Sequence, residues 1–350
     1  MKAFYKKYDL KFKVPGGTSR GVLTSKETWL LLICSKERYG VGECGLFKGL
    51  SVDDVAEYED VLEQTCADID LGFDKLYDRL KDFPSIQFGL EQAFLSLQSK
   101  DPFEIFPSKF TTQQDSIKIN GLIWMGEIAF MKRQIAEKLN EGFNCIKIKI
   151  GALDFDAECD LLTKIRKTYP ASQVELRLDA NGAFVPKEAM KKLEKLATYD
   201  IHSIEQPIKQ GNISEMKMLC KNSPIPIALD EELIGVQSVR AKQQMLQIID
   251  PQFIILKPSL LGGFKASEAW IKLAEELNIG WWVTSALESN IGLNAIAQWT
   301  YMLKSSIPQG LGTGKLFTNN FLSPLEIING HLVSGKENKW NFNYIKELCL

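Results

Sequence analysis

Histidine is scarce in this chain of 350 residues, which contains only His202 and His331. Two histidines leave little material for a Ser–His–Asp triad, a polyhistidine metal site or a histidine proton relay. We therefore expect any acid–base chemistry to use lysine, carboxylate, tyrosine or cysteine side chains.

Paired cysteines and long apolar runs are also missing. The seven cysteines are odd in number and lack CxxC spacing, which argues against a disulfide framework or a zinc site and favours a reducing compartment. The N-terminal run "MKAFYKKYDLKFKV" lacks the apolar core of a signal peptide, and no apolar run approaches the ~20 residues that span a bilayer. We expect a soluble, cytoplasmic protein.

The chain has no large excess of charge of either sign. Lysine plus arginine is 42 and aspartate plus glutamate is 44, which gives a net charge of −2. Such a balance provides no basic field for nucleic acid or for an anionic membrane. The expected partner is a small molecule, and association into a homo-oligomer is left open.

The order of strand-like and helix-like runs predicts an α/β protein with two regions. Residues 1–115 indicate a small α+β domain, onto which residues 318–350 are expected to pack back. Residues 116–317 alternate strands and helices, with eight strands in ~200 residues, the pattern of a parallel (β/α)8 barrel of modified TIM type. A doubly wound sheet is the alternative, but no GxGxxG turn follows an early strand.

The run "CIKIKIG", residues 145–151, carries two lysines in an isoleucine-rich strand. Alternation along a strand puts Lys147 and Lys149 on one face and the isoleucines on the other. Helices cover the outside of a barrel, so we expect the lysines to point inward. Trp281 and Trp282, on a later strand, are expected to pack on the outer face.

A charged side chain closes each of six consecutive predicted barrel strands, at intervals of 25 to 31 residues. In order they are Lys149, Asp179, Glu205, Asp230, Lys257 and Glu288. About one strand–helix unit separates neighbours, which brings all six to the C-terminal rim, where such barrels hold their active sites. Six charges in register favour an active site over unrelated charges at loop edges.

Three of these side chains, Asp179, Glu205 and Asp230, are carboxylates on adjacent strands. They would repel one another in a dry cavity unless a cation lay among them. Oxygen ligands favour a hard cation, Mg²⁺ above all, with Mn²⁺ as a substitute. Lysines on either side of the metal suit acid–base chemistry across a bound substrate.

At these residues the sequence resembles the enolase superfamily, and within it the muconate-lactonising subgroup. The matching motifs are "KIK" at Lys147 and Lys149, "LDAN" at Asp179, "IEQP" at Glu205, "LDE" at Asp230 and "LKPS" at Lys257. The resemblance spans the whole chain and implies that the N-terminal region and the C-terminal tail form a capping domain over the barrel.

Within the subgroup the chain is most similar to the o-succinylbenzoate synthases, through "GGTSRG", "GECGLFKGLS", "SALESNIGL" and "GLGTGKLF". This similarity implies a Mg²⁺-dependent lyase of menaquinone biosynthesis that dehydrates a succinylated hydroxycyclohexadiene carboxylate. An N-acylamino-acid racemase or a dipeptide epimerase is the alternative, since these relatives share the same lysines and metal ligands. The absence of a carboxylate in "GLGTGKLF", where dipeptide epimerases often hold the substrate ammonium, disfavours the epimerase.

The resemblance implies a role for each lysine. Lys149 is expected to take the proton next to the substrate carboxylate, which leaves an enediolate. Lys147 is expected to supply the positive field that keeps Lys149 partly deprotonated, and Lys257 to face the substrate as a fixed cation.

Further residues are expected to support the site. Asn181 and Glu231 would orient the metal ligands, and Ser285 and Glu288 would line the rim near the far end of the substrate. Thr18 and Arg20 lie on a capping loop that would close over the site and exclude water.

Overall fold

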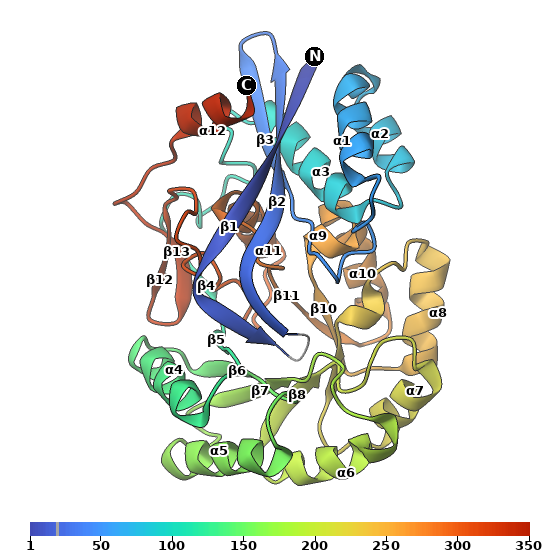
Figure 1. Ribbon diagram of the computed structural model, residues 1–350, viewed down its shortest axis with the longest axis vertical. Coiled ribbons are helices and arrows are strands. Elements are labelled where there is room, and N and C mark those ends of the chain that lie inside the picture. The colour runs from blue at the N-terminus through green and yellow to red at the C-terminus, as the bar shows by residue number, and fades with distance from the viewer. Residues whose placement is uncertain (19–20) are drawn as a thin grey trace.

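The computed structural model describes residues 1–18 and 21–350, which form two regions (Figure 1). One is an antiparallel sheet with helices on one face, and the other is a ring of parallel strands surrounded by helices. The long strands of the antiparallel sheet extend down to the end of the parallel ring, so a cavity between the regions has one wall from each.

The antiparallel sheet contains β1 (Lys2–Thr18), β2 (Gly21–Ser35) and β3 (Arg38–Cys44). Its helices are α1 (Tyr58–Ala67), α2 (Phe73–Arg79) and α3 (Pro84–Gln98). Trp29, Leu31 and Ile33 alternate along β2 and form one buried cluster with residues of these helices. A Cβ on Gly42 would lie 1.9 Å from the carbonyl oxygen of Gly89, so glycine permits the close contact between β3 and α3.

Within the described residues, seven parallel strands form the second sheet, in the spatial order β11-β10-β9-β8-β7-β6-β5. Their bounds are β5 (Gly121–Ile123), β6 (Cys145–Lys149), β7 (Glu175–Asp179), β8 (Ile201–Glu205), β9 (Ile227–Leu229), β10 (Phe253–Leu256) and β11 (Gly280–Val283). Parallel bridges from Gln309 to Ile119 and from Gly310 to Thr284 close the ring. The predicted barrel is confirmed, with its weak eighth strand reduced to these bridges.

Helices return the chain from the end of one barrel strand to the start of the next. They are α4 (Ile128–Asn140), α5 (Phe155–Thr168), α6 (Pro186–Ala197), α7 (Ile213–Asn222), α8 (Val239–Ile249), α9 (Pro258–Leu261), α10 (Gly263–Glu276) and α11 (Asn290–Met302). Capping side chains determine where several of these helices begin. Asp154, Ser238 and Ser289 accept hydrogen bonds from backbone N–H groups in the first turns of α5, α8 and α11, respectively. Pro186 begins α6, where its missing N–H costs nothing.

The two faces of β6 confirm the alternation predicted for "CIKIKIG". Ile146, Ile148 and Ile150 belong to the main hydrophobic core, which includes residues of the surrounding helices. Lys147 and Lys149 instead line the cavity at the end of the barrel.

The interior of the barrel below this cavity is filled by a separate buried cluster. Ala228, Ile255 and Trp282 form a buried cluster there, and the Arg177 guanidinium lies 4.5 Å from the centre of the Trp282 ring. The expected outer-face packing is therefore wrong for Trp282. Trp282 lies two residues before the cavity-lining Thr284, so alternation puts it on the inner face of β11.

The C-terminal segment contacts both regions. Strands β12 (Leu325–Ile328) and β13 (His331–Ser334) form a hairpin that pairs with β4 (Ile117–Lys118). Helix α12 (Phe342–Cys349) follows, and its Ile345 and Cys349 share a buried cluster with Leu30 and Leu32 of β2.

The seven cysteines are all free thiols, as their spacing predicts. Across residues 1–18 and 21–350, no helix combines the length and the apolar character needed to cross a membrane.

Candidate active site

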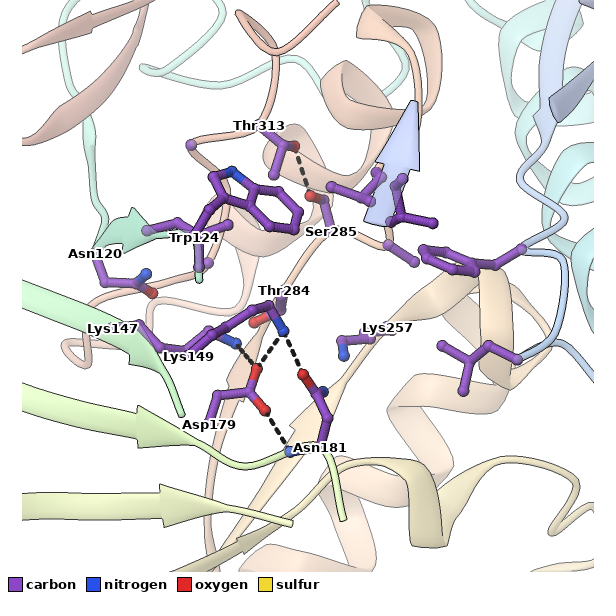
Figure 2. Close-up of a pocket in the computed structure, with 18 residues that line it drawn as sticks. Asn120, Trp124, Lys147, Lys149, Asp179, Asn181, Lys257, Thr284, Ser285 and Thr313 are labelled. Carbon is purple, nitrogen blue, oxygen red and sulfur yellow. Dashed lines mark hydrogen bonds and ion pairs between the residues drawn. The ribbon is translucent and has the colours of Figure 1, made fainter. Parts of the chain in front are cut away.

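The cavity at the C-terminal end of the barrel strands is lined by residues of both regions (Figure 2). The barrel contributes most of its polar side chains, and β2 and the loop after β3 contribute apolar ones. The lining residues are Leu23, Phe47, Leu50, Asn120, Leu122, Trp124, Lys147, Lys149, Asp179, Asn181, Lys257, Thr284, Ser285, Ala286, Leu287, Gly310, Gly312 and Thr313.

Lys149 ends β6 and reaches two groups at the end of β7. Its Nζ lies 2.9 Å from Oδ2 of Asp179 and donates to Oδ1 of Asn181 at 2.7 Å (Figure 2). The side chain is buried, with 8% of the residue exposed. Because β6 and β7 are neighbours in register, with Lys149 opposite Asp179, the sheet itself fixes this contact.

Lys147 lies deeper in the barrel and bridges two carboxylates. Its Nζ is 2.7 Å from Oε2 of Glu205 and 3.1 Å from Oδ2 of Asp179. Burial lowers the pKa of Lys147, but Glu205 and Asp179 raise it more, so the net shift is upward. The raised pKa favours the protonated form of Lys147.

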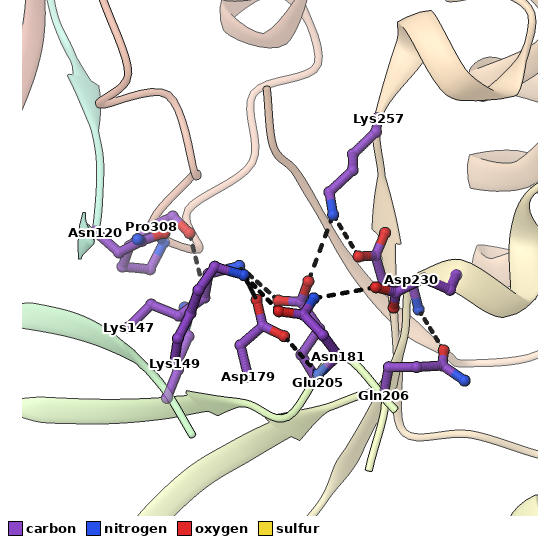
Figure 3. A network of polar contacts seen from close by, with 12 residues as sticks. Asn120, Lys147, Lys149, Asp179, Asn181, Glu205, Gln206, Asp230, Lys257 and Pro308 are labelled. Atoms are coloured by element: carbon purple, nitrogen blue, oxygen red, sulfur yellow. Dashed lines mark hydrogen bonds and ion pairs between the residues drawn. The ribbon is translucent and has the colours of Figure 1, made fainter. Parts of the chain in front are cut away.

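Lys257 approaches the carboxylates from the other side of the barrel, on the residue after β10 (Figure 3). It forms an ion pair with Asp230, and its Nζ lies 3.6 Å from Oε1 of Glu205. Burial lowers the pKa of Lys257, while Asp230 and Glu205 raise it more strongly, so it too stays protonated.

Asp179, Glu205 and Asp230 are brought together as predicted, and each has 2% or less of its surface exposed. Burial raises the pKa of Asp179, but Lys149 and Lys147 lower it more strongly. The net shift is downward, so Asp179 is ionised. Burial raises the pKa of Asp230 well above its usual value; Lys257 opposes this rise, and the neighbouring Glu231 and Glu205 add to it. Crowded carboxylates of this kind favour additional positive charge.

The donor chemistry of these three carboxylates fits a hard divalent cation. Among the described residues, Oε1 of Glu205 is buried without a hydrogen-bond donor, and Nζ of Lys257 lies 3.6 Å from it. In the described part of the chain, no group of three or more His, Cys, Asp and Glu residues has an arrangement ready to hold a metal. The lysines lie against the carboxylate oxygens instead, so a cation would have to displace Lys147 or Lys257 from one of them.

Asn181 and Glu231 connect the ends of β7 and β9. Nδ2 of Asn181 donates to Oε1 of Glu231 at 3.0 Å, and its backbone N donates to Oδ1 of Asp179 at 3.1 Å. Asn181 has a φ of 44°, an unusual conformation that turns the chain back over the strand end. Asn181 therefore contacts Asp179, one of the ligands that it was predicted to orient, and Glu231 contacts Asn181.

Ser285 lies in the cavity as predicted, and its Oγ is 2.6 Å from Oγ1 of Thr313 (Figure 2). Arg20 and the side chain of Thr18, predicted to close over the site, lie outside the described residues.

Glu288 does not line the cavity, which corrects its predicted position. Strand β11 ends at Val283, and Thr284 takes the rim position in register with the other strand ends. The chain then turns through Leu287, whose φ is 65°, and leaves Glu288 fully buried. Its carboxylate accepts hydrogen bonds from the backbone N of Ala286 at 2.8 Å and from the hydroxyl of Ser259.

The apolar wall of the cavity did not emerge from the sequence pattern. Leu23, Phe47, Trp124 and Leu287 form this wall, and all four belong to one hydrophobic cluster. Phe47 lies in "GECGLFKGLS", a motif that carried the resemblance, so that motif was the available signal. Asn120 was also missed, although it is a buried polar residue beside the first barrel strand.

Comparison with known proteins agrees with this geometry. Residues 131–335 match the family described as enolase C-terminal domain-like. The chain is 47% identical to an o-succinylbenzoate synthase of Desulfotalea psychrophila, over 95% of this chain and 98% of that protein. The crystal structure of MenC from the same organism superposes with a TM-score of 0.85 at 44% identity and covers 95% of this chain and 99% of that one.

A more distant structure shares the fold. A dipeptide epimerase of Enterococcus faecalis, solved with Mg and the dipeptide L-Leu-L-Tyr, has a TM-score of 0.83 at 19% identity and covers 96% of this chain and 97% of that one. From the near-complete match at 47% identity and from the family model, this chain belongs to the enolase superfamily and, within it, to the o-succinylbenzoate synthase family.

Proposed function

We propose that this chain is a Mg²⁺-dependent lyase of menaquinone biosynthesis. It would dehydrate 2-succinyl-6-hydroxy-2,4-cyclohexadiene-1-carboxylate to o-succinylbenzoate. The observation that carries the proposal is the near full-length match to a synthase of that name, at 47% identity. The opposed lysines and the three buried carboxylates supply the groups that such a reaction needs.

The residues that would hold Mg²⁺ are Asp179, Glu205 and Asp230. When bound, the cation supplies positive charge that stabilises the substrate carboxylate as negative charge develops on it. Asn181 and Glu231 support this arrangement, because Asn181 contacts both Asp179 and Glu231.

Lys149 is the proposed base. Lys149 ends a short, buried strand and lines the cavity. Asp179 and Asn181 hold its Nζ, so the position of this atom is fixed before substrate binds. It would accept the proton from the ring carbon that bears the carboxylate. The same ammonium would then return a proton to the departing hydroxyl, so that water leaves and the ring becomes aromatic.

Lys147 and Lys257 would act through their charge. Lys147 contacts Asp179, the carboxylate that also holds Lys149, so its positive charge lies beside the proposed base. Lys257, from β10, faces the cavity from the side opposite β6 and would stabilise the anionic intermediate.

The apolar wall would hold the ring and exclude water. Leu23 from β2, Phe47 from the loop after β3, and Trp124 and Leu287 from the barrel surround the apolar part of the cavity. Exclusion of water strengthens every electrostatic interaction at the strand ends.

A racemase or epimerase of N-acylated amino acids or dipeptides is the second candidate. The observation that favours it is the placement of Lys149 and Lys257 on opposite sides of the cavity, which suits proton transfer at both faces of a carbon. In the dehydratase, by contrast, Lys149 performs both proton transfers.

The two candidates are separated by incubating the protein with Mg²⁺ in D₂O. One sample contains the cyclohexadiene precursor and another an N-succinyl amino acid. Formation of o-succinylbenzoate, abolished by EDTA and restored by Mg²⁺, is the expected result. Deuterium incorporation and racemisation of the amino acid without any dehydration would contradict the dehydratase.

A further inference from the structure

Three charged side chains lie buried behind the apolar wall, outside the lysine–carboxylate site. They are Lys26 on β2, Glu43 on β3 and Glu288 after β11, with 5%, 0% and 0% of their surfaces exposed. None of them lines the catalytic cavity. Buried charges are costly unless they are paired, so this group requires an explanation.

Glu43 joins the antiparallel sheet to the barrel. One oxygen accepts from Oγ1 of Thr28 at 2.7 Å and from the backbone N of Ser289 at 2.8 Å. The other accepts from the hydroxyl of Ser289 and from the backbone N of Gly292 at 2.8 Å. A carboxylate of one region thus satisfies the first N–H groups of helix α11 in the other.

Glu288 joins two barrel loops to each other. One oxygen accepts from Ser259, two residues after Lys257, and the other from the backbone N of Ala286 in the wall. A Cβ on Gly45 would lie 2.9 Å from Cβ of Ser259 and 3.2 Å from Cγ of Glu288, so the loop after β3 is packed directly on this contact.

Lys26 is the cation of the group, and its Nζ is buried without a hydrogen-bond acceptor among the described residues. Burial lowers the pKa of Lys26, and the charges of Glu43 and Glu288 oppose that shift. Among the described residues Lys26 forms no ion pair with either glutamate, so it acts on them through its field at longer range.

Each of these charges lies in a segment that delivers one residue of the apolar wall. Lys26 is three residues after Leu23, Glu43 is four before Phe47, and Glu288 follows Leu287. Leu23, Phe47 and Leu287 contact one hydrophobic cluster, and Lys26 lines a small second cavity together with Leu23 and Phe47. The charges therefore lie directly behind the surface that would face the substrate.

We propose that Lys26 is a positioning residue for the substrate pocket. Its buried charge holds Glu43 of the antiparallel sheet and Glu288 of the barrel together, and so sets the spacing between Leu23 and Phe47 on one side and Leu287 on the other. The inference rests on the proposed function, since that wall would contact the part of the substrate remote from its reacting carboxylate. Proton transfer at Lys149 lies on the opposite wall and does not depend on this spacing.

Replacement of Lys26 by methionine tests the role, because methionine fills a similar volume without charge. We expect Lys26→Met to raise KM about tenfold and to leave kcat within about threefold, the pattern of weakened contacts in an apolar pocket. Adding Glu288→Gln to Lys26→Met removes one of the two opposing carboxylates. We expect the KM of this double variant to fall part of the way back to the wild-type value. The matched control is Lys48→Met, since Lys48 lines the same small cavity but is exposed and pairs with Glu27.

An unchanged KM in Lys26→Met, whatever the melting temperature of that variant, would overturn the inference. A rise in KM of the same size in Lys48→Met would also overturn it. If Lys26→Met does not fold, Glu288→Gln alone provides the test, and an unchanged KM in that variant overturns the inference. KM is measured with whichever substrate the wild-type chain accepts, so a failure of the proposed function shows in the wild type and a failure of this inference shows in the variants.

Discussion

The two walls of the cavity are built in different ways. The barrel wall consists of charged side chains at the ends of short, buried strands, where Lys147, Lys149 and Asp179 are held within 3.1 Å of their partners. The apolar wall consists of Leu23, Phe47, Trp124 and Leu287, which lie near strand ends and on loops. Rigid elements thus carry the groups that need fixed geometry, and adaptable segments carry the groups that need only shape.

This difference separates the energetics of the two walls. On the barrel wall, removing one partner leaves other charges buried and unpaired, which is costly. On the apolar wall, truncation removes contact area with the substrate and leaves the charges in place. Mutations on the barrel wall should therefore affect the chemical step, and mutations on the apolar wall should affect substrate binding.

The largest effect is expected for Lys149→Ala on the barrel wall. Loss of the base should reduce kcat for dehydration by roughly 10³-fold, within the usual contribution of general acid–base catalysis. Mg²⁺ binding, measured by calorimetry, should be retained, because Lys149 is not one of the proposed ligands. Lys138→Ala, at a surface ion pair with Glu141, is the control. Appreciable dehydration by Lys149→Ala would rule out its role as base.

Replacement of Glu205, on the same wall, tests whether this residue is a ligand of Mg²⁺. Glu205→Gln keeps the shape of the side chain and removes its charge. We expect Mg²⁺ affinity to fall by more than about 100-fold, because loss of a residue that only hydrogen-bonds to a ligand already lowers metal affinity about 10–100-fold. The measurement is the rise in melting temperature on Mg²⁺ addition, which is independent of activity. An undiminished Mg²⁺ response in Glu205→Gln would remove Glu205 from the ligand set.

A smaller effect is expected on the apolar wall. Phe47→Ala should raise KM about tenfold with little change in kcat, because the lost area contacts the substrate and not the reacting atoms. Val52→Ala, at an exposed position later in the same loop, is the control. A large fall in kcat with KM unchanged would show that the two walls do not divide their work in this way.

The smallest effect concerns the contact between the two regions. Glu91 of α3 accepts hydrogen bonds from the backbone N of Phe264 at 2.6 Å and of Lys265 at 3.1 Å, at the start of α10. Burial raises the pKa of Glu91 from 4.5 to about 7. Between these pH values the unfolded chain releases a proton that the folded protein keeps, so stability falls as pH rises through this window.

Glu91→Gln should remove this part of the pH dependence. Relative to the variant, the wild type should lose about 1–3 kcal/mol of unfolding free energy between pH 4.5 and 7 and show no further loss above it. Urea denaturation at a series of pH values measures this difference. Parallel stability curves for the two proteins would contradict the raised pKa.

Alternation and strand-end spacing were sufficient to predict the barrel wall. Lys147, Lys149, Asp179, Glu205, Asp230 and Lys257 lie together because a period of two residues and a repeat of one strand–helix unit determine their direction. The same rule, applied to Trp282 relative to Thr284, would have placed that tryptophan inside the barrel.

Positions set by loops could not be predicted in the same way. The side chain of Glu288 points away from the cavity because Leu287 adopts a φ of 65°, which no local pattern indicated. The apolar wall depends on packing between segments far apart in the chain, since Phe47 packs against the cluster that contains Leu287. The ion pairs of the lysines with the carboxylates likewise depend on the closed ring of strands and not on any one segment.

A competition between two substrates separates dehydration from racemisation in a single experiment. The wild-type protein with Mg²⁺ is given the cyclohexadiene precursor and an N-succinyl amino acid in one tube, and both products are followed with time. We expect o-succinylbenzoate to be the dominant product, with kcat/KM for dehydration at least about 100-fold above that for racemisation. This ratio corresponds to a difference of about 2.7 kcal/mol in transition-state stabilisation. Racemisation at an equal or higher kcat/KM would contradict this expectation.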